Sequence, residues 1–347
     1  MTTEFTRRTL RAELIRPGVL EMREVPVPSP GPGELLVRVE AALTCGTDLK
    51  TYRRGHPKIP LPAPFGHEFA GTVAATGAGI TRFREGDAIA AVPTAPCGEC
   101  RLCRRGRENL CAQAVGRMVL GAFGEYLLLP PHLVAQGNVF QRPPHLSAEQ
   151  AAALEPLACV VHGASRVSFA SAETILILGD GPIALLFVQL ATASGGRVVL
   201  VGRHEVRLAA ARTFGAETMV IQDADPAHAI VDHLGGKADV VIEAVGEPSL
   251  WETAHGLAST GGEVLLYGGC AAGAQARFDT GRLHYDEIDL KGAFHYTRAA
   301  VRTAFDLLAG GAVDASPLIT HRLPLSALEQ ALALVATREA IKVAVLP

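Results

Sequence analysis

One stretch of the chain combines side chains that bind a reactive metal ion. Cys45 is followed, about twenty residues later, by His67 and Glu68. A thiolate, an imidazole and a carboxylate hold zinc tightly and can leave one coordination position open for chemistry. The combination predicts a catalytic metal centre; the alternative is that Cys45 is a small buried hydrophobic residue.

A second group of cysteines has the spacing of a structural metal site. Its members are separated by two, two and seven residues and are Cys97, Cys100, Cys103 and Cys111. Four sulfurs complete the tetrahedral coordination of zinc and leave no place for a substrate. We expect them to pin a lobe at about residues 93–113, with an iron–sulfur cluster as the alternative occupant.

A glycine turn lies between a predicted strand and a predicted helix. It has the G-x-G-x-x-A form of the dinucleotide fingerprint and comprises Gly179, Gly181, Pro182, Ile183 and Ala184 with the intervening aspartate. The glycines permit a tight turn and a close approach of a pyrophosphate, which meets the N-terminus of the helix. Between a strand and a helix this motif predicts binding of NAD or NADP.

The residues after the next strand bear on the choice of cofactor. NAD-binding chains usually carry an acid there, and this chain has Gly202, Arg203 and His204. Loss of the carboxylate removes repulsion against a 2′-phosphate, and Arg203 offers that phosphate a charged partner. We favour NADP; the alternative is an NAD enzyme in which Arg203 stacks on adenine and Arg207 binds the ribose.

Later strands of the same region supply further cofactor neighbours. Val245 and Gly268 follow apolar runs, at the strand ends where open parallel sheets bind ligands. We expect both residues near the cofactor. Trp251, the single tryptophan, is interpreted as ordinary packing.

An acidic residue interrupts an apolar helix between the two regions. The stretch from Ser147 to Ala164 has helical spacing, and Ser147 with Gln150 forms a capping box. Glu155 lies inside this stretch, where a buried carboxylate without a partner is costly. A cation would offset that cost, so Glu155 is a further candidate ligand; the alternative is a glutamate exposed at a bend.

Length and composition favour two domains and small polar partners. The 347 residues are 48% hydrophobic and 19% charged, which is enough apolar surface for two cores. A net charge of -3 gives no reason to propose nucleic acid or an acidic membrane as a partner. The N-terminus lacks the apolar core of a signal peptide, and seven cysteines, an odd number, favour metal ligation in a reducing compartment. We expect a cytoplasmic protein.

The first metal group resembles the zinc signature of the zinc-containing alcohol dehydrogenases, in the medium-chain dehydrogenase/reductase superfamily. The residues that carry this resemblance are Gly66, His67, Glu68, Gly71, Gly77 and Ile80. The resemblance runs through nearly the whole chain and favours the polyol, sorbitol and threonine dehydrogenase branch. It implies an α/β protein with a GroES-like β-barrel catalytic domain at 1–152 and 297–347. A Rossmann doubly wound parallel-sheet domain at 153–296 would bind the cofactor.

The same resemblance implies roles for individual residues. Asp48 would support the zinc-bound histidine, and Thr47 would accept the proton of the substrate alcohol. Lys50 stands where many members carry a histidine that ends the proton relay, so solvent, the cofactor ribose or Lys50 could serve as its exit. Glu155 matches a position of a zinc ligand or near-ligand, and Phe294 lies in a segment that approaches nicotinamide and substrate.

Together these features predict a zinc-dependent oxidoreductase that transfers hydride between NAD(P) and a secondary alcohol, with two zinc ions per chain. A polyol, cyclitol or similar polyhydroxylated compound is the favoured substrate, and simple secondary alcohols or ketones are the alternative. A non-catalytic cofactor-binding protein is the third possibility. By resemblance, we expect a homodimer or homotetramer.

Overall fold

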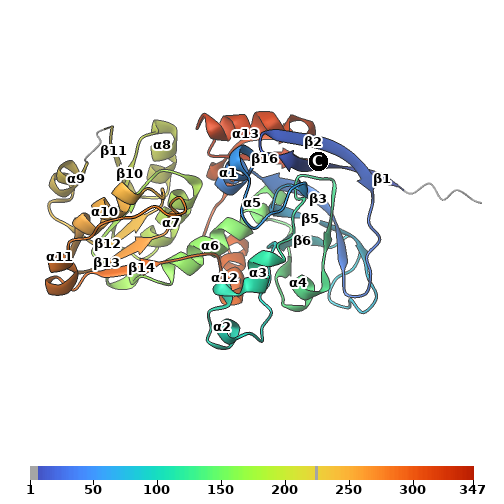
Figure 1. Cartoon of the computed structure of the whole chain (residues 1–347), viewed down its shortest axis with the longest axis horizontal. Coiled ribbons are helices and arrows are strands. Elements are labelled where there is room, and N and C mark those ends of the chain that lie inside the picture. The colour runs from blue at the N-terminus through green and yellow to red at the C-terminus, as the bar shows by residue number, and fades with distance from the viewer. Residues whose placement is uncertain (1–6, 223–225) are drawn as a thin grey trace, which may run out of the picture. The chain divides into compact units, whose positions relative to one another are not determined.

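A computed structural model gives the fold and describes residues 7–222 and 226–347. The chain divides into two units (Figure 1). Unit 1 contains the residues up to Ala158 together with Tyr296–Pro347, and unit 2 is Cys159–His295. Within the described ranges, no helix is long and apolar enough to cross a membrane.

Unit 1 is built on two sheets of mainly antiparallel strands. The larger has the order β15-β16-β3-β5-β6-β8, with β7 paired to β3, and the smaller has the order β2-β1-β4. Only β15 and β16 pair in parallel among these described strands. The bounds are β1 (Arg8–Arg16), β2 (Val19–Pro26), β3 (Leu35–Leu43), β4 (Ala63–Pro64), β5 (Glu68–Thr76), β6 (Ala88–Ala91), β7 (Tyr126–Leu129), β8 (Val139–Gln141), β15 (Ile319–Pro324) and β16 (Lys342–Leu346).

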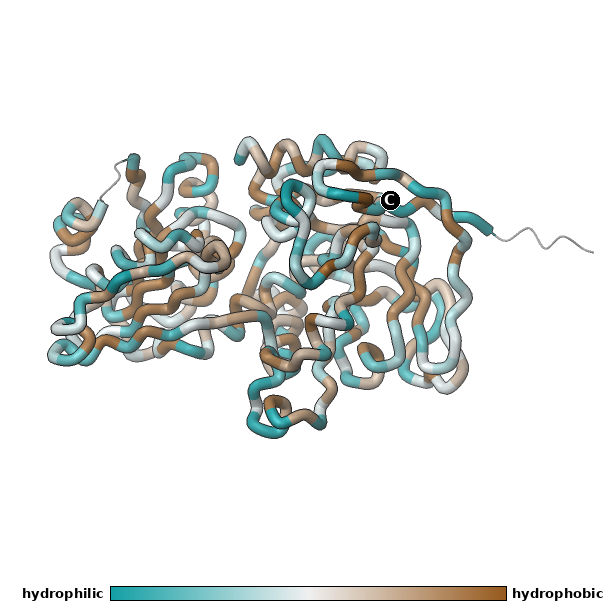
Figure 2. The backbone as a smooth tube through the Cα atoms, viewed as in Figure 1, coloured by the Kyte–Doolittle hydropathy of each residue, from teal (hydrophilic) through white to brown (hydrophobic). Residues whose placement is uncertain are grey.

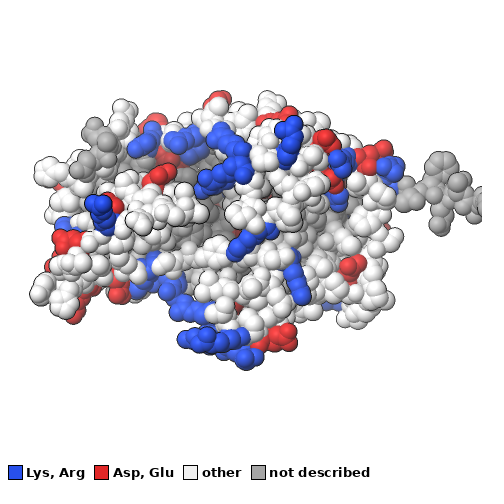
Figure 3. Space-filling view, in the orientation of Figure 1, with Lys and Arg blue, Asp and Glu red and all other residues white. Residues whose placement is uncertain are grey.

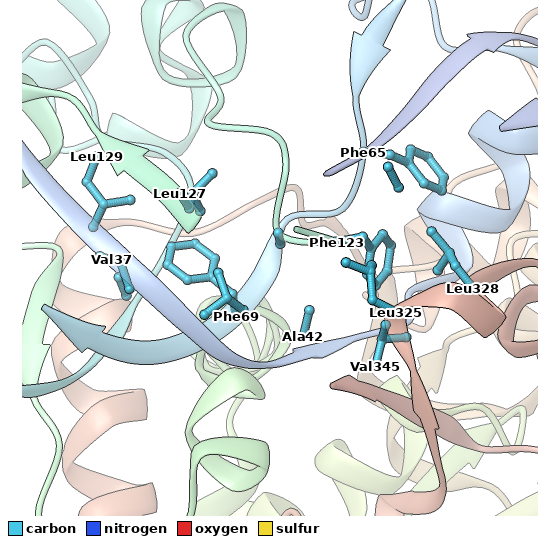
Figure 4. Close-up of a cluster of buried hydrophobic side chains, with 14 of the residues drawn as sticks. Val37, Ala42, Phe65, Phe69, Phe123, Leu127, Leu129, Leu325, Leu328 and Val345 are labelled. Atoms are coloured by element: carbon cyan, nitrogen blue, oxygen red, sulfur yellow. The ribbon is translucent and has the colours of Figure 1, made fainter. Parts of the chain in front are cut away.

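The core of unit 1 joins the two ends of the chain. Val37, Phe69, Phe123 and Val345 are completely buried and belong to one cluster, whose members lie close together in Figure 4. Fully burying a side chain of this kind contributes about 1.5–3 kcal/mol. The cluster therefore fixes the C-terminal strand β16 against β3, and that placement matters for the metal site.

Short helices and 3-10 turns complete unit 1. The helices are α1 (Gly46–Arg54), α2 (Arg101–Arg104), α3 (Ala112–Gly116), α4 (Pro131–Ala135), α5 (Ala148–Ala152), α12 (Arg298–Ala309) and α13 (Leu328–Ala336). The 3-10 turns are η1 (Glu108–Leu110), η3 (Ser316–Leu318) and η4 (Leu325–Ala327).

The single helix expected over 147–164 is two helices. The capping box is present, since Ser147 Oγ accepts from the Gln150 N–H and Gln150 Oε1 accepts from the Ser147 N–H. However, α5 ends at Ala152 and α6 (Leu154–Ala164) starts two residues later. Pro156 explains the break, because proline has no N–H to donate to the carbonyl four residues earlier.

Unit 2 is a six-stranded sheet in which every pair of neighbours is parallel. Its order, β11-β10-β9-β12-β13-β14, is the 3-2-1-4-5-6 order of doubly wound dinucleotide-binding sheets. The strands are apolar (Figure 2), as expected when helices cover both faces. The predicted fold class is confirmed. The bounds are β9 (Thr174–Leu178), β10 (Arg197–Gly202), β11 (Glu217–Val220), β12 (Ala238–Glu243), β13 (Ala258–Leu266), β14 (Asp289–Gly292), α7 (Pro182–Thr192), α8 (Glu205–Thr213), α9 (Ala227–Leu234), α10 (Pro248–Leu257), α11 (Thr280–Tyr285) and the 3-10 turn η2 (Phe169–Ser171).

Candidate metal centres and cofactor loop

Strand register brings the first metal group together. Leu43, the last residue of β3, pairs with Glu68, the first residue of β5. Cys45 therefore follows β3 at the point where His67 leads into β5. One ligand atom from each of Cys45, His67 and Glu68 lies within 4.8 Å of the other two.

The start of α1 orients Cys45 and His67 through one carboxylate. Cys45 is the N-cap of α1, and its Sγ accepts from the Thr47 N–H at 3.4 Å. Asp48 returns a bond through Oδ2, which accepts from the Cys45 N–H at 3.0 Å. Its Oδ1 lies 3.0 Å from Nδ1 of His67. A carboxylate at Nδ1 fixes the ring and leaves Nε2 for a metal, which fits the supporting role expected of Asp48.

The charge of Asp48 makes His67 a strong base. Burial lowers the pKa of His67, but the Asp48 carboxylate and its hydrogen bond, with a contribution from Cys45, hold that pKa well above the ordinary 6.5. In the protein without metal, a proton therefore occupies the imidazole. Zinc binding has to displace that proton, so metal affinity rises with pH.

Glu68 has one oxygen satisfied and the other without a partner. Its Oε2 accepts from Lys342 Nζ at 2.5 Å, and the same ammonium donates to the Thr44 carbonyl at 3.0 Å. Glu68 and Lys342 are 0% and 1% exposed. Oε1 is buried and has no hydrogen-bond partner among the described residues. Such a bare buried acceptor is rare in folded proteins, and beside a thiolate and an imidazole it fits a zinc ligand.

Burial dominates the electrostatics of Glu68. It raises the pKa of Glu68 to about 7, against the opposing effects of Lys342 and His67, and the Glu155 charge adds to the rise. Burial lowers the pKa of Lys342, but Glu68, Cys45 and Glu155 outweigh it, so that pKa is raised. Lys342 is thus a buried cation among candidate ligands. The sequence reasoning missed it, although a lysine inside the apolar IKVAVL strand was a usable signal.

Glu155 lies near this group without joining it as closely. It is 8% exposed at the start of α6, so the alternative of a glutamate exposed at a bend is wrong. Its charge acts on both Glu68 and Lys342. However, it is not part of the group of Cys45, His67 and Glu68, whose ligand atoms lie within 4.8 Å of one another. Cys159, one turn later, is half-buried.

Thr47 and Lys50 are the two polar side chains expected to move protons. Thr47 is the second residue of α1, and its side chain is exposed. Lys50 is exposed on the same helix. Both are available to solvent, so the structure is compatible with either of them exchanging a proton with water.

The four cysteines of the second group form one cluster. Cys103 Sγ lies 3.5 Å from that of Cys100 and 3.9 Å from that of Cys97, and Cys97 lies 3.6 Å from Cys111. Zinc–sulfur bonds of about 2.3 Å in a tetrahedron would place sulfurs about 3.8 Å apart. Burial and the neighbouring thiols raise the pKa of Cys103 to about 12. The cluster fits a structural zinc site, which would hold all four sulfurs as thiolates.

The lobe around these cysteines is strongly basic. Figure 3 shows Lys and Arg side chains gathered over α2. The exposed arginines of this segment are Arg101, Arg104, Arg105 and Arg107. Four thiolates bring more negative charge than one zinc ion neutralises, and nearby guanidinium groups offset the excess.

A long-range ion pair ties the lobe to α12. Glu108 Oε1 accepts from Arg298 Nη2 at 2.5 Å and from its Nε at 2.9 Å, and Oε2 accepts from the Arg298 N–H at 3.0 Å. Two residues earlier, the buried Tyr296 hydroxyl lies 2.7 Å from Oγ1 of Thr94. The sequence carried no signal for these contacts, because about two hundred residues separate each pair.

The glycine turn has the geometry that a pyrophosphate needs. Gly179 follows β9 with a φ of 111°. Gly181 caps α7, and Pro182 and Ile183 occupy its first turn. An added Cβ at Gly179 would lie 2.7 Å from the side chain of Val245. The strand ends that carry these two predicted cofactor residues are therefore adjacent.

A buried glutamate shapes the neighbouring strand ends. Glu243, the last residue of β12, accepts from the N–H groups of Val245 and Gly246 at 2.8 Å. Its other oxygen accepts from Trp251 Nε1, which also donates to the Gly268 carbonyl. The interpretation of Trp251 as ordinary packing was incomplete, because its indole N–H links two strand ends. Val245 is 44% exposed, and so is available to a cofactor.

The glycine turn after β9 contains a further residue that the sequence analysis did not single out. Asp180, between the two glycines, lies against Gly202 and accepts from the N–H groups of Arg203 and His204. Arg207 is buried with Nη1 at 3.6 Å from Asp180 Oδ1, whereas Arg203 is exposed. Of the other predicted cofactor residues, Phe294 is half-exposed, at 51%.

Comparisons with known proteins agree with this geometry. Residues 31–138 match the alcohol dehydrogenase GroES-like domain, and residues 182–310 match the zinc-binding dehydrogenase family. Sorbitol dehydrogenase of Bombyx mori is 32% identical over 93% of this chain and 94% of its own length. L-threonine 3-dehydrogenase of Mesorhizobium japonicum is 33% identical over 88% of this chain and 89% of its own.

A solved structure shares the fold throughout. It is of a Sinorhizobium meliloti protein described as a zinc-binding dehydrogenase, bound to NADP. The two chains are 33% identical with a TM-score of 0.90, and the match covers 98% of this chain and all of the other. Full-length relatives at this identity establish more than a shared fold. The chain therefore belongs to the zinc-containing alcohol dehydrogenases of the medium-chain dehydrogenase/reductase superfamily.

Proposed function

We propose that this dehydrogenase transfers hydride between NADP(H) and a secondary alcohol group of a polyhydroxylated compound, or the matching ketone. The observation that carries the proposal is the group of Cys45, His67 and Glu68, with a buried carboxylate oxygen that lacks a partner. The same chain presents a glycine turn of dinucleotide-binding geometry.

The chain's residues have distinct tasks in this reaction. Cys45, His67 and Glu68 would hold the catalytic zinc, with Glu155 close enough to influence the site electrostatically. When bound, zinc lowers the pKa of a substrate hydroxyl so that it ionises near neutral pH. Thr47 Oγ1 takes the proton that this hydroxyl gives up, and Lys50 or water carries it away. Asp48 keeps His67 in the orientation that leaves Nε2 for the metal.

The preference for a polyhydroxylated substrate is supported by the relatives. Sorbitol and L-threonine, named for two of them, each carry a secondary hydroxyl beside a second polar group. Fold alone does not fix the substrate. A simple secondary alcohol is the second candidate, favoured by the exposed, uncharged side chains of Val245 and Phe294 near the predicted cofactor region.

The preference for NADP rests on the turn after β10. Gly202 offers no carboxylate to ribose hydroxyls, and Arg203 is exposed and available to a 2′-phosphate. The similar Sinorhizobium meliloti structure binds NADP. A cytoplasmic location and a homodimer or homotetramer stay predictions of the sequence.

The test is a set of initial rates with NADP and with NAD across sorbitol, other polyols, L-threonine and simple secondary alcohols. We expect turnover with at least one polyhydroxylated compound and a higher kcat/KM with NADP. His67→Ala should abolish turnover, whereas His228→Ala, which alters a 92% exposed side chain of unit 2, should not. No turnover by zinc-replete protein across the panel would favour the non-catalytic alternative.

A further inference from the structure

Asp180 fills the space beside Gly202, the position at the end of β10 where NAD-binding chains usually carry an acid. An added Cβ at Gly202 would lie 2.6 Å from Cβ of Asp180 and 2.7 Å from its Oδ2. No real Cβ makes contacts this short, so position 202 accepts no side chain while Asp180 keeps its place. The end of β10 therefore carries no acid, and the carboxylate of Asp180, from the glycine turn, lies against position 202 instead.

The carboxylate of Asp180 is already engaged with the protein. Oδ2 accepts from the Arg203 N–H at 2.7 Å, from the His204 N–H at 2.8 Å and from His204 Nδ1 at 2.8 Å. Burial raises the pKa of Asp180, but these hydrogen bonds outweigh it and hold that pKa below the ordinary value. An ionised oxygen with three donors has little capacity left for the hydroxyls of a ribose.

The surroundings of Asp180 are cationic. Arg207 pairs with Oδ1, and the exposed Arg203 has no side-chain partner among the described residues. Glu205, the acid at the start of α8, is paired with Arg212 at 2.7 Å. The two arginines against the single Asp180 leave the turn positively charged even with His204 neutral.

We infer that Asp180 is a positioning residue for NADP, which fixes the turn at Arg203 and His204 so that it receives the 2′-phosphate rather than a ribose hydroxyl. This inference rests on the proposed use of NADP. A dianionic phosphate favours cationic donors and N–H donors that are held in fixed positions. Asp180 supplies the fixing, since two backbone N–H groups and one side chain of the turn depend on it.

The experiment is a fluorescence titration of NADPH and of NADH on the intact protein, which needs no catalysis. Asp180→Ala should weaken NADPH binding at least tenfold and change NADH binding less than threefold. Asp180→Asn keeps an acceptor at the same position and should retain the NADPH preference. The double variant Asp180→Ala with Gly202→Asp returns the acid to β10 and should bind NADH more tightly than NADPH.

Asp239→Ala is the matched control. Asp239 Oδ2 also accepts from two backbone N–H groups, those of Glu173 and Thr174, but at the start of β9 rather than its end. Its loss should leave the ratio of NADPH to NADH affinity unchanged. Trp251 fluorescence reports that unit 2 is folded in each variant, because this tryptophan packs against its core.

Three results would overturn the inference. If Asp180→Ala weakens the binding of NADPH and of NADH equally, Asp180 only determines the conformation of the glycine turn. Tighter NADPH binding in that variant would show that the carboxylate opposes the phosphate. Loss of the preference in Asp180→Asn as well would place the effect in charge rather than in positioning. Failure of the proposed function is separate: it appears as wild-type protein that binds NADH as tightly as NADPH, or that turns over no substrate.

Discussion

Replacing Lys342 by methionine tests whether the C-terminal strand completes the catalytic metal site. The Lys342 ammonium lies 2.5 Å from Glu68 Oε2 and 3.0 Å from the Thr44 carbonyl oxygen. The side chains of Lys342 and Glu68 are both almost fully buried. Methionine keeps most of the side chain's length and packing. It removes the charge that holds Glu68.

The expected loss of folding stability depends on whether Glu68 stays ionised once Lys342 is removed. Removing one partner of a buried pair costs about 3–5 kcal/mol. Here Glu68 escapes part of that cost by taking a proton, because its pKa is already raised from 4.5 to about 7 and loses an opposing charge. Protonating such a carboxyl at pH 7 costs about 3 kcal/mol relative to the unfolded chain, at 1.36 kcal/mol per pH unit. Wild-type Glu68 already carries most of this protonation cost at pH 7, because its pKa is about 7. The difference between variant and wild type therefore comes mainly from the lost ion pair, and we expect a destabilisation at the lower end of the range, about 3 kcal/mol, in metal-free protein.

The pH dependence has a definite sign. A carboxyl whose folded pKa lies above its unfolded value is neutral in the folded protein, and that form is favoured at low pH. Stability held by the neutral form is present below pH 4.5 and is lost as pH rises through the folded pKa. The protonation cost in the Lys342→Met variant should therefore shrink to about 1 kcal/mol at pH 5.

Hydrogen exchange measured by mass spectrometry is the suitable assay, because it resolves the two units. Peptides from β3, β5 and β16 should exchange on the order of 100-fold faster in the metal-free Lys342→Met variant. The peptide that contains Trp251 belongs to unit 2 and should exchange at the same rate in the variant as in the wild type. Lys291→Met, which breaks the more exposed Lys291–Glu263 pair of unit 2, is the matched control and should cost about 1 kcal/mol or less.

A double variant separates the ion pair from simple loss of packing. Lys342→Met combined with Glu68→Leu removes both charges, and replacing a buried pair by apolar residues is often neutral. It should regain most of the lost protection. The reasoning is refuted if Lys342→Met leaves the exchange of β3, β5 and β16 unchanged, or if the double variant is no more protected than the single one.

Three further predictions concern the other sites. Arg203→Ala should raise KM for NADP at least tenfold and KM for NAD less than twofold in initial-rate assays, and equal effects on both would refute the phosphate role. Cys103→Ser should lower the zinc content measured by atomic emission from two ions per chain to about one, whereas Cys270→Ser should leave two. Asp48→Asn should weaken catalytic zinc binding about 10–100-fold in competition with a chelator, and unchanged affinity would show that the His67 orientation does not depend on it.

The sequence predicted those features that depend on short spacing. Cys97 to Cys111 spans fifteen residues, and the glycine turn spans six, so local pattern and known metal chemistry were sufficient. The parallel sheet was implied by the family resemblance, together with the position of the glycine turn between a strand and a helix. The boundary between α5 and α6 was missed because Pro156 was weighed less than the apolar spacing around it.

The residues that sequence reasoning missed act across long separations. Lys342 reaches Glu68 because β16 pairs with β3, which in turn pairs with β5. Asp180 reaches Arg203 because β9 and β10 are neighbours in the sheet. In both cases a charged side chain is buried by strand pairing, and no local pattern encodes which strand will be the neighbour. A buried charge inside an apolar strand or a glycine turn is nevertheless visible in the sequence. Its cost without a partner means that a partner must exist, and the two cases here place those partners at the candidate metal site and at the turn predicted to bind the cofactor.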